Sequence, residues 1–379
     1  MSGRFVNEAL VGIAGSRAKL ATPALVIDLD AFERNIAKMA DHVRRNGMSI
    51  RPHAKTHKCV EIAKLQIAAG AVGQCCAKLG EAEAMGAGGI ESLIITSPVV
   101  TQQGIARAMA LNAKVSDLML TVDNPENATA LAAAAKASGK PLKVLVDLDP
   151  GLHRTGIAPG EPVLALAKQI HADDNLVLRG LQCYAGHVMH IEEFAERREA
   201  SLVAMKLLGE TRDAFKAAGL PTDIISGGGT GSFDIDPEAH VLTELQGGSY
   251  AFMDKQYNDV KAPNGGAAPF ETSLFVQMSV VSNNTAGLAT TDAGFKAFST
   301  DAEPPVLLSG APEGAKYFFF GDEQGGIALP GGGKLPLGAS LTAITPHCDP
   351  TVNLYDAYHV VRGDTLVAIW PIEARGKSA

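Results

Sequence analysis

One lysine of the 379-residue chain stands among residues that could make its amine reactive. Lys55 lies in the run RPHAKTHK (51–58), beside His53, His57 and Lys58. Neighbouring cationic groups disfavour a further charge, so we expect them to lower the pKa of Lys55 and to favour the nucleophilic amine. Such an amine forms Schiff bases with carbonyl compounds. A solvated basic loop is the alternative interpretation of the same run.

Two glycine-rich segments could bind an anion. In SGGGTGS (226–232) side chains are almost absent, which leaves backbone amides free to surround a phosphate. ELQGGSYAF (244–252) is a second small-residue turn shortly afterwards. Neither ends in the Gly-Lys-Ser/Thr of a Walker-type loop. Further residues that could contribute to this site are Ser226, Thr230, Ser232, Gly248, Ser249 and Tyr250.

A third group of candidate residues lies in PHCDPT (346–351). His347 and Asp349 stand two residues apart, so on an extended segment both side chains face the same way and could share one divalent ion. Cys348 would then face the other side. Two ligands leave several coordination positions open, which is typical of a catalytic metal. A turn with an ordinary histidine and a capping aspartate is the alternative.

The elements that must position these residues alternate regularly from residue 22 onwards. Short apolar runs, several apolar on both faces as in parallel strands covered by helices, lead into helical or loop sequence. The runs are 24–28, 49–55, 72–78, 92–98, 117–123, 142–149, 176–186 and 222–229. Eight such runs predict a (β/α)8 barrel, with a doubly wound open sheet as the main alternative. Barrel active sites lie at the carboxyl ends of the strands, where Lys55 falls.

The pattern of apolar and turn-forming residues changes past about residue 265. Short alternating runs separated by Gly, Pro, Asn and Asp predict a C-terminal β domain. We therefore expect a barrel over residues 22–265 and a β domain over residues 266–379 that carries the metal pair. Residues 1–21 could pack with the second domain.

Composition excludes several classes of protein. The chain is 46% hydrophobic and 20% charged, as in a globular protein, and its formal net charge is −8. Nucleic acid is not an expected partner, because phosphate-backbone binding needs concentrated Lys and Arg. The sequence shows neither a signal peptide nor 18 consecutive apolar residues, so we expect no membrane association and a cytoplasmic location.

Several motifs in order resemble the D-threonine aldolase family of alanine-racemase-like enzymes, which use pyridoxal 5'-phosphate (PLP). They are RPHAKTHK, GLHRTG (151–156), YAGHVMH (184–190), SGGGTGS, ELQGGSYAFMD (244–254), DAGFKAFSTD (292–301), GDEQG (321–325) and PHCDPTVNLYD (346–356). The likeness covers nearly the whole chain. It implies a PLP-binding barrel with a second β domain, and a homodimer.

The resemblance also implies a role for individual residues. Lys55 corresponds to the Schiff-base lysine, Arg154 lies beside the cofactor's 3-hydroxyl, and Tyr184 belongs to the surroundings of its ring. The phosphate cradle is implied at Gly228, Gly229, Thr230, Gly248, Ser249 and Tyr250. His347 and Asp349 correspond to the ligands of a divalent metal, for which manganese, magnesium and cobalt are equally suitable.

The activity implied is the retro-aldol cleavage of D-threonine and other D-β-hydroxy-α-amino acids to glycine and an aldehyde, which makes the protein a carbon–carbon lyase. A base must take the β-hydroxyl proton, and His190 is the first candidate, with His187 second. A packing role is the alternative for either histidine.

Related enzymes dehydrate D-serine or D-3-hydroxyaspartate and share most of these motifs. In a dehydratase Lys55 would also remove the Cα proton. The dehydratases typically carry a cysteine two residues after the metal-binding histidine, where this chain has Asp349, which favours the aldolase. A non-catalytic PLP-binding barrel is an alternative from another class, although such proteins lack a second domain. A racemase would need a second base, and no matching tyrosine can be identified from the sequence.

Overall fold

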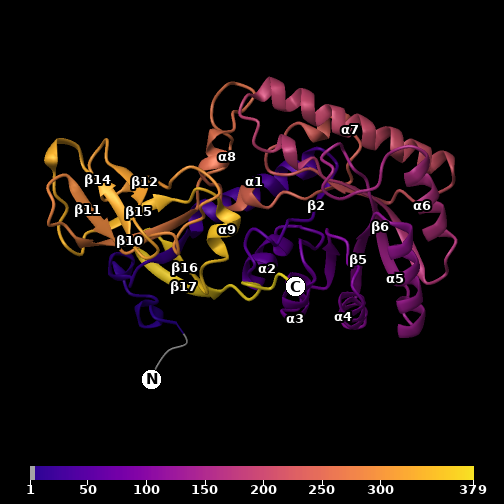
Figure 1. The fold of residues 1–379 in the computed structure, drawn as a ribbon, viewed down its shortest axis with the longest axis horizontal. Coiled ribbons are helices and arrows are strands. Elements are labelled where there is room, and N and C mark those ends of the chain that lie inside the picture. The colour runs from indigo at the N-terminus through magenta and orange to yellow at the C-terminus, as the bar shows by residue number, and fades with distance from the viewer. Residues whose placement is uncertain (1–4) are drawn as a thin grey trace.

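The computed structural model describes residues 5–379, in which a barrel and a β-rich domain lie side by side (Figure 1). In the described residues eight parallel strands follow the order β2-β9-β8-β7-β6-β5-β4-β3. They are β2 (Ser49–Ile50), β3 (Gln74–Cys76), β4 (Ser92–Ile95), β5 (Asp117–Val122), β6 (Leu142–Asp147), β7 (Leu176–Cys183), β8 (Ile224–Gly227) and β9 (Glu244–Leu245).

The two edges of this sheet meet just after β2. His53 and Cys75 form a parallel bridge, in which the Ala54 N–H donates to the Cys75 carbonyl at 2.7 Å and the Cys75 N–H donates to the Pro52 carbonyl at 2.8 Å. The sheet therefore curls round until it closes. The predicted barrel is confirmed, and the open doubly wound sheet is wrong.

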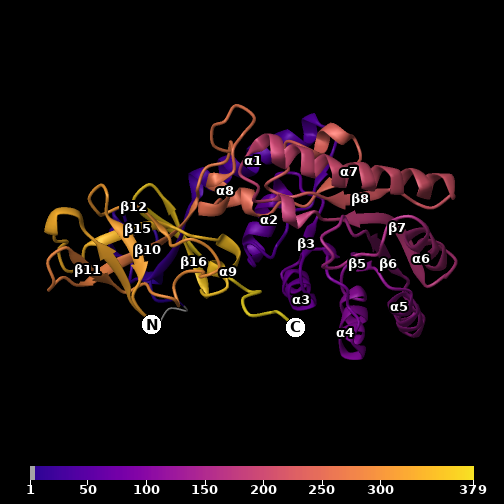
Figure 2. The ribbon, with the colours of Figure 1, turned by 45° about the horizontal axis from the view of Figure 1, so that its top comes forward.

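Helices cover the outer side of the strands (Figure 2). They are α2 (Val60–Ala68), α3 (Leu79–Ala87), α4 (Gln102–Asn112), α5 (Pro125–Ser138), α6 (Glu161–His171) and α7 (Phe194–Ala217). Local sequence explains where α5 begins and ends. The Asn124 side chain accepts a hydrogen bond from the Glu126 N–H at 2.7 Å, Pro125 is the first helical residue, and Gly139 ends the helix at a φ of 72°.

The second domain is built on a mostly antiparallel sheet. Along its main path the described strands follow the order β13-β14-β11-β10-β1-β16-β17, and β15 pairs with β10 and β12. They are β1 (Ala24–Asp28), β10 (Leu274–Ser282), β11 (Leu288–Thr291), β12 (Val306–Ser309), β13 (Lys316–Phe319), β14 (Gly325–Ala328), β15 (Ser340–Ile344), β16 (Ala357–Arg362) and β17 (Thr365–Pro371).

The assignment of residues 24–28 to the barrel is wrong. This segment is β1, which pairs antiparallel with β10 and parallel with β16, and the eighth barrel strand is β9. An apolar five-residue run fits either sheet, and its partners lie some 250 residues or more away in the sequence, so its pattern does not decide between them. The domain limits 22–265 and 266–379 stay a prediction.

Helix α1 (Leu29–Arg45) carries the chain from β1 into the barrel (Figure 1). Asp28 caps it, because its carboxylate accepts a hydrogen bond from the Ala31 N–H at 3.1 Å. Its buried apolar side chains recur every three or four residues, so that one face packs inward. These are Leu29, Phe32, Ile36, Met39 and Val43.

Residues before β1 contact the second domain. The Gly12 N–H donates to the Leu366 carbonyl at 2.8 Å and the Arg17 N–H donates to the Asp364 carbonyl at 2.9 Å. Of the segment 1–21, residues 1–4 lie outside the described part. No helix within residues 5–379 is long and apolar enough to cross a membrane. The cytoplasmic location and the homodimer stay predictions.

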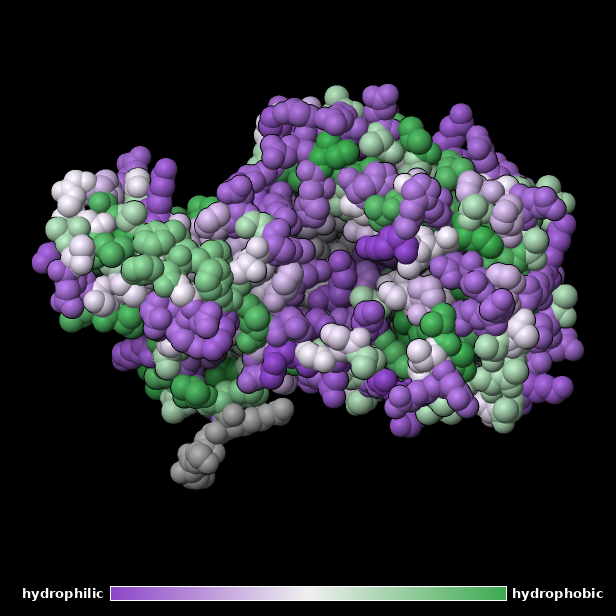
Figure 3. Space-filling model, in the orientation of Figure 1, coloured by the Kyte–Doolittle hydropathy of each residue, from purple (hydrophilic) through white to green (hydrophobic). Residues whose placement is uncertain are grey.

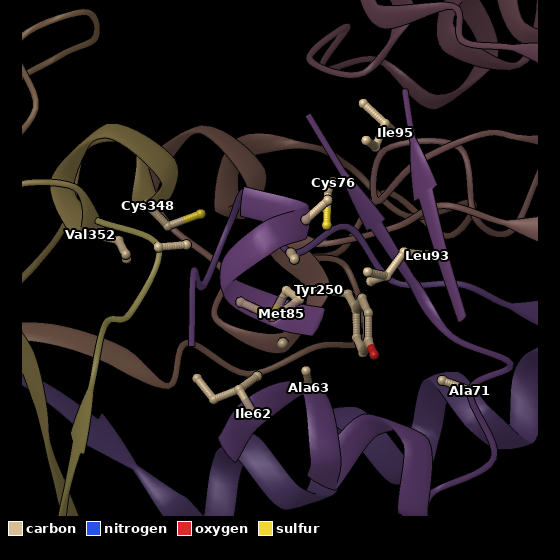
Figure 4. Close-up of a cluster of buried hydrophobic side chains, with 14 of the residues drawn as sticks. Ile62, Ala63, Ala71, Cys76, Met85, Leu93, Ile95, Tyr250, Cys348 and Val352 are labelled. Carbon is tan, nitrogen blue, oxygen red and sulfur yellow. The ribbon is translucent and has the colours of Figure 1, made fainter. Parts of the chain in front are cut away.

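One large apolar core extends from the barrel helices into the second domain. Figure 4 shows part of it, where Cys348 and Val352 lie near Ile62 and Met85. A smaller cluster joins side chains from five barrel strands. Its members are Cys75, Ile94, Met119, Leu145 and Ile224. Close packing of this kind makes the barrel a solid support for the residues at its strand ends.

A buried ion pair joins β9 to the residue that follows β2. Two Arg51 nitrogens donate to the two Glu244 carboxylate oxygens at 2.9 Å each, and a third bond of 2.7 Å reaches the Ser92 hydroxyl. The side chains of Arg51 and Glu244 are only 3% and 9% exposed. We expect Arg51→Leu to lower the free energy of unfolding by about 3–5 kcal/mol in urea titrations, because Glu244 is left buried without its partner.

The matched control is Lys64→Met, which breaks the pair of Lys64 and Glu61, whose side chains are 52% and 47% exposed. Exposed pairs contribute little, so this change should cost less than about 1 kcal/mol. Equal losses in the two variants would contradict the role assigned to Arg51.

Candidate active site

A cavity of about 470 Å³ opens at the carboxyl ends of the barrel strands. Figure 3 shows a hollow near the middle of the face, surrounded largely by hydrophilic residues. Its lining includes residues from the segments that follow β2, β6, β7, β8 and β9. Those singled out from the sequence are Lys55, Arg154, Tyr184, Gly229, Thr230, Gly248 and Ser249.

Lys55 lies in the turn that follows β2, and its Nζ is 3.1 Å from Oδ2 of Asp349. This carboxylate raises the pKa of Lys55 above its ordinary value, against the effect of burial. The expected lowering by neighbouring cations is therefore wrong. Lys58 instead pairs with Glu81 at 2.6 Å, and burial lowers the pKa of His57 to about 4.

The segment with His347 and Asp349 is not extended. Helix α9 (Cys348–Val352) begins there, and His347 is its N-cap residue. The argument that both side chains share one face of a strand is wrong, because successive helical residues turn by about 100°. Cys348 is buried in the core, whereas Asp349 reaches Lys55.

The ring of His347 is held by a second carboxylate. Its Nδ1 lies 2.7 Å from Oδ2 of Asp301, which leaves Nε2 as the nitrogen without this contact. Burial favours a neutral Asp349, but the nearby Lys55 and His347 lower the pKa of its carboxyl group below the ordinary value. Within residues 5–379 no cluster of three or more His, Cys, Asp or Glu side chains is arranged to bind a metal.

The two glycine turns meet at one side of the cavity. The Tyr250 N–H donates to the Thr230 hydroxyl at 3.0 Å, which ties the turns together. A Cβ on Gly248 would lie 2.5 Å from Oγ1 of Thr56, and one on Gly229 would lie 2.6 Å from Sδ of Met189. A side chain at Gly248 would also meet the His53 backbone at 3.0 Å, whereas at Gly229 the contacted atom belongs to a flexible methionine side chain.

Four candidates from the glycine segments do not line the cavity. The Ser226 hydroxyl accepts a hydrogen bond from Gln246, and the Ser232 hydroxyl donates to Asp236. Gly228 shapes the turn with a φ of 66°, where a side chain is strained. The phenol of Tyr250 is buried beneath the turn and accepts a hydrogen bond from Gln66 at 3.4 Å. These residues support the turn rather than face the open space.

Arg154 and Tyr184 line the cavity together. The guanidinium carbon of Arg154 lies 5.4 Å from the centre of the Tyr184 ring, which is a cation–π contact. They come from the segments after β6 and β7, which neighbour one another in the barrel. The structure therefore places both beside the glycine turns, at the same open end of the barrel.

The two candidate histidines occupy different places. The ring of His190 lies 4.6 Å from that of Tyr257 and 6.4 Å from that of His347. Burial, with the charges of His347 and Lys55, lowers the pKa of His190 to about 4. His187 lies in a short turn of 3-10 helix, and both histidines are exposed and outside the cavity lining. Of the two, only His190 lies close to the other site residues.

Sequence reasoning missed several polar residues of the cavity. They are His53, Lys78, Thr96, Asp147, Gln182, Gln246 and Tyr257. Their positions at or just after the ends of barrel strands were the signal that could have identified Asp147 and Gln182. Burial raises the pKa of Asp147 to about 6, although Gln182 and Thr155 donate hydrogen bonds to its carboxylate.

Comparisons with known proteins agree with this architecture. Residues 27–256 match the family "Alanine racemase, N-terminal domain", and residues 273–361 match "Putative serine dehydratase domain". The chain is 38% identical to 3-hydroxy-D-aspartate aldolase of Paracoccus denitrificans, over 99% of this chain and 98% of that protein. It is 39% identical to D-threonine aldolase of an Arthrobacter species, over 95% and 94%.

A solved structure is similar throughout. The crystal structure of D-threonine aldolase from Filomicrobium marinum superposes with a TM-score of 0.91 at 37% identity, covering 96% of this chain and 97% of that one. The chain therefore belongs to the alanine racemase N-terminal domain family. The relatives named above are aldolases, and D-threo-3-hydroxyaspartate dehydratase of a Delftia species is also similar over nearly its full length, at 29% identity over 93% of this chain and 97% of that protein. The predictions of an enzyme and of a lyase are confirmed.

The residues present fit the groups that the family resemblance implies. Two glycine turns line one side of the cavity with Gly229, Thr230, Gly248 and Ser249, which offer backbone amides and small hydroxyl groups of the kind that bind phosphate. Lys55 faces the same cavity. An imidazole and a carboxylate, from His347 and Asp349, are donors that suit a divalent cation such as manganese.

Asp236 supports the glycine turn from behind. Its buried carboxylate accepts hydrogen bonds from the Ser201 hydroxyl at 2.5 Å and the Ser232 hydroxyl at 2.6 Å. Burial raises the pKa of Asp236 to about 6, so between roughly pH 4 and 6 the folded chain binds this proton more tightly than the unfolded chain. The contribution of Asp236 to stability therefore falls as the pH rises through this interval.

Asp236→Asn cannot ionise and should lose this dependence. We expect the stability of the wild type relative to Asp236→Asn to fall by about 3 kcal/mol between roughly pH 4 and 7, measured by urea unfolding. The exposed change Asp213→Asn should retain a pH dependence close to that of the wild type. A constant difference between the wild type and Asp236→Asn would contradict the raised pKa.

Proposed function

We propose that this enzyme cleaves D-threonine and related D-β-hydroxy-α-amino acids to glycine and an aldehyde, with PLP on Lys55 and a divalent metal held by His347 and Asp349. The observation that carries the proposal is the 3.1 Å contact between Lys55 Nζ and Asp349 Oδ2. It brings the Schiff-base candidate and the metal-ligand candidate into direct contact. The full-length likeness to two aldolases of D-amino acids supports the same reaction.

The bound groups would each supply one kind of chemistry. PLP supplies an aldehyde for the amino group and a ring that accepts the electrons released at Cα. We propose that its phosphate lies against Gly229, Thr230, Gly248 and Ser249, with Ser226, Gly228 and Tyr250 supporting the turn. The metal supplies a Lewis acid for an oxygen of the substrate.

The protein's own groups would orient the substrate and move its proton. We propose that His190 accepts the β-hydroxyl proton, since it lies near His347 and is largely unprotonated at neutral pH. As the Cα–Cβ bond breaks, the β-oxygen becomes the aldehyde oxygen and Cα is protonated to give glycine. Arg154 and Tyr184 would border the cofactor ring. The cation–π contact between Arg154 and Tyr184 limits the conformational freedom of both side chains.

A dehydratase is the second candidate. It is favoured by the match of residues 273–361 to the putative serine dehydratase domain. Such an enzyme would use Lys55 to remove the Cα proton and would release the β-hydroxyl group instead of cleaving Cα–Cβ. Cys348 does not supply the cysteine of the dehydratase pattern, because it is buried in the core.

Product analysis distinguishes the two reactions. The holoenzyme given D-threonine should release glycine and acetaldehyde in equal amounts, measured by amino-acid analysis and an aldehyde-reducing enzyme. Release of 2-oxobutanoate and ammonia would identify the dehydratase. Lys55→Ala should lower turnover by about a thousandfold or more, because it removes the cofactor anchor. Lys64→Ala, at an exposed position, should retain full activity.

Metal removal tests the roles of His347 and Asp301. A chelator should abolish turnover, and manganese should restore it. Asp301→Asn removes the charged acceptor beside His347 Nδ1, so we expect the half-saturating manganese concentration to rise by about 10- to 100-fold. Asp356→Asn, an exposed change, should leave that concentration unaltered. Turnover that survives complete chelation would exclude the metal from the reaction.

A further inference from the structure

One tyrosine of the cavity has a buried ring but an unused hydroxyl. Tyr257 lies in helix α8 (Lys255–Asp259), just after the second glycine turn, and is only 6% exposed. No residue of the described chain, 5–379, forms a hydrogen bond with its hydroxyl, and the side chain lines the cavity. Buried tyrosines normally have a partner for this group.

The other three buried tyrosines follow that rule. The hydroxyl of Tyr317 donates to the Ala293 carbonyl at 2.7 Å, and that of Tyr358 donates to the His57 carbonyl at 2.7 Å. The hydroxyl of Tyr250 accepts from Gln66 at 3.4 Å. The unused group of Tyr257 is therefore an exception within the described residues, and it occurs in the cavity.

The position of Tyr257 relative to α9 is held by one buried carboxylate. Oδ1 of Asp254 accepts from the Tyr257 N–H at 2.9 Å, and Oδ2 accepts from the Cys348 N–H at 2.8 Å. Asp254 is fully buried, so it joins α8 directly to the helix that carries Asp349. The Tyr257 ring packs against His190, with centroids 4.6 Å apart.

We propose that the Tyr257 hydroxyl binds the β-oxygen of the substrate as a hydrogen-bond donor. The inference rests on the proposed function, in which His190 accepts the proton of that oxygen. The proton passes from the β-hydroxyl to His190, and negative charge develops on the oxygen before the Cα–Cβ bond breaks. Tyr257 keeps its own proton and donates a hydrogen bond to the charged oxygen, as donors of an oxyanion site do.

The charges of the other lining residues favour this assignment. The cationic side chain of Lys78, which also lines the cavity, is available to pair with the substrate carboxylate. A neutral phenol suits an oxygen that becomes charged only during the reaction. Burial and nearby acidic groups, including Asp254 and Asp349, raise the pKa of Tyr257 well above its ordinary value, so the phenol remains a donor.

A pair of ligands that differ in one hydroxyl group tests the proposal. D-2-Aminobutyrate is D-threonine without its β-hydroxyl, and we expect it to compete with D-threonine for the holoenzyme. Tyr257→Phe keeps the ring against His190 and removes only the donor. We expect kcat/KM for D-threonine to fall by about 100-fold, while the inhibition constant of D-2-aminobutyrate stays unchanged. Tyr317→Phe, which removes a hydroxyl bonded within the second domain, should alter neither value.

Two results would overturn the proposal. An unchanged kcat/KM would mean that the hydroxyl makes no contact that matters to the reaction. A rise in the inhibition constant equal to the loss in kcat/KM would mean that Tyr257 only shapes the cavity.

Failure of the proposed function would be recognised separately. In that case the wild type releases no glycine from D-threonine. The affinities of the two amino acids, read from the change in cofactor absorption, then test Tyr257 alone. Tyr257→Phe must lower the affinity for D-threonine and leave the affinity for D-2-aminobutyrate unchanged. Equal changes in both affinities would overturn the inference.

Discussion

The closure of the barrel beside β2 is the constraint on which the candidate site depends. This strand has only two residues, and Lys55 lies in the turn that follows it. The bridge between His53 and Cys75 joins the sheet edges on one side, and the buried pair of Arg51 and Glu244 joins β9 on the other. Hydrogen bonds on both sides therefore fix the backbone beside Lys55. A strand of two residues could not hold this turn in place alone.

Three carboxylates fix the remaining parts of the cavity, of which Asp236 and Asp254 are buried and Asp301 is exposed. Asp236 holds the first glycine turn through Ser232, and Asp254 connects α8 with α9. Asp301 orients the ring of His347. Each of these groups acts on a loop or a short helix, where few ladder hydrogen bonds are available. The cavity is thus built from loops and short helices, and one carboxylate side chain holds each of them in place.

Much of the site could be predicted because its chemistry lies in short motifs. Lys55, the glycine turns, and the pair His347 and Asp349 are recognisable by residue type and spacing, and the structure places members of all three groups close together. Their electrostatics could not be predicted in the same way. The pKa of Lys55 depends on Asp349, almost three hundred residues away, and this outweighs the neighbours in its own motif.

The sequence by itself determined the periodic alternation that makes a barrel, the β-rich second domain and the family to which the chain belongs. These follow from local patterns and from motifs that need no contact to be recognised. Only the tertiary structure decided that residues 24–28 join the second sheet, that α9 begins at Cys348, and that the Tyr257 hydroxyl is left without a partner in the described chain. The physical reason is that pairing, burial and charge depend on residues distant in the chain, which a local pattern does not record.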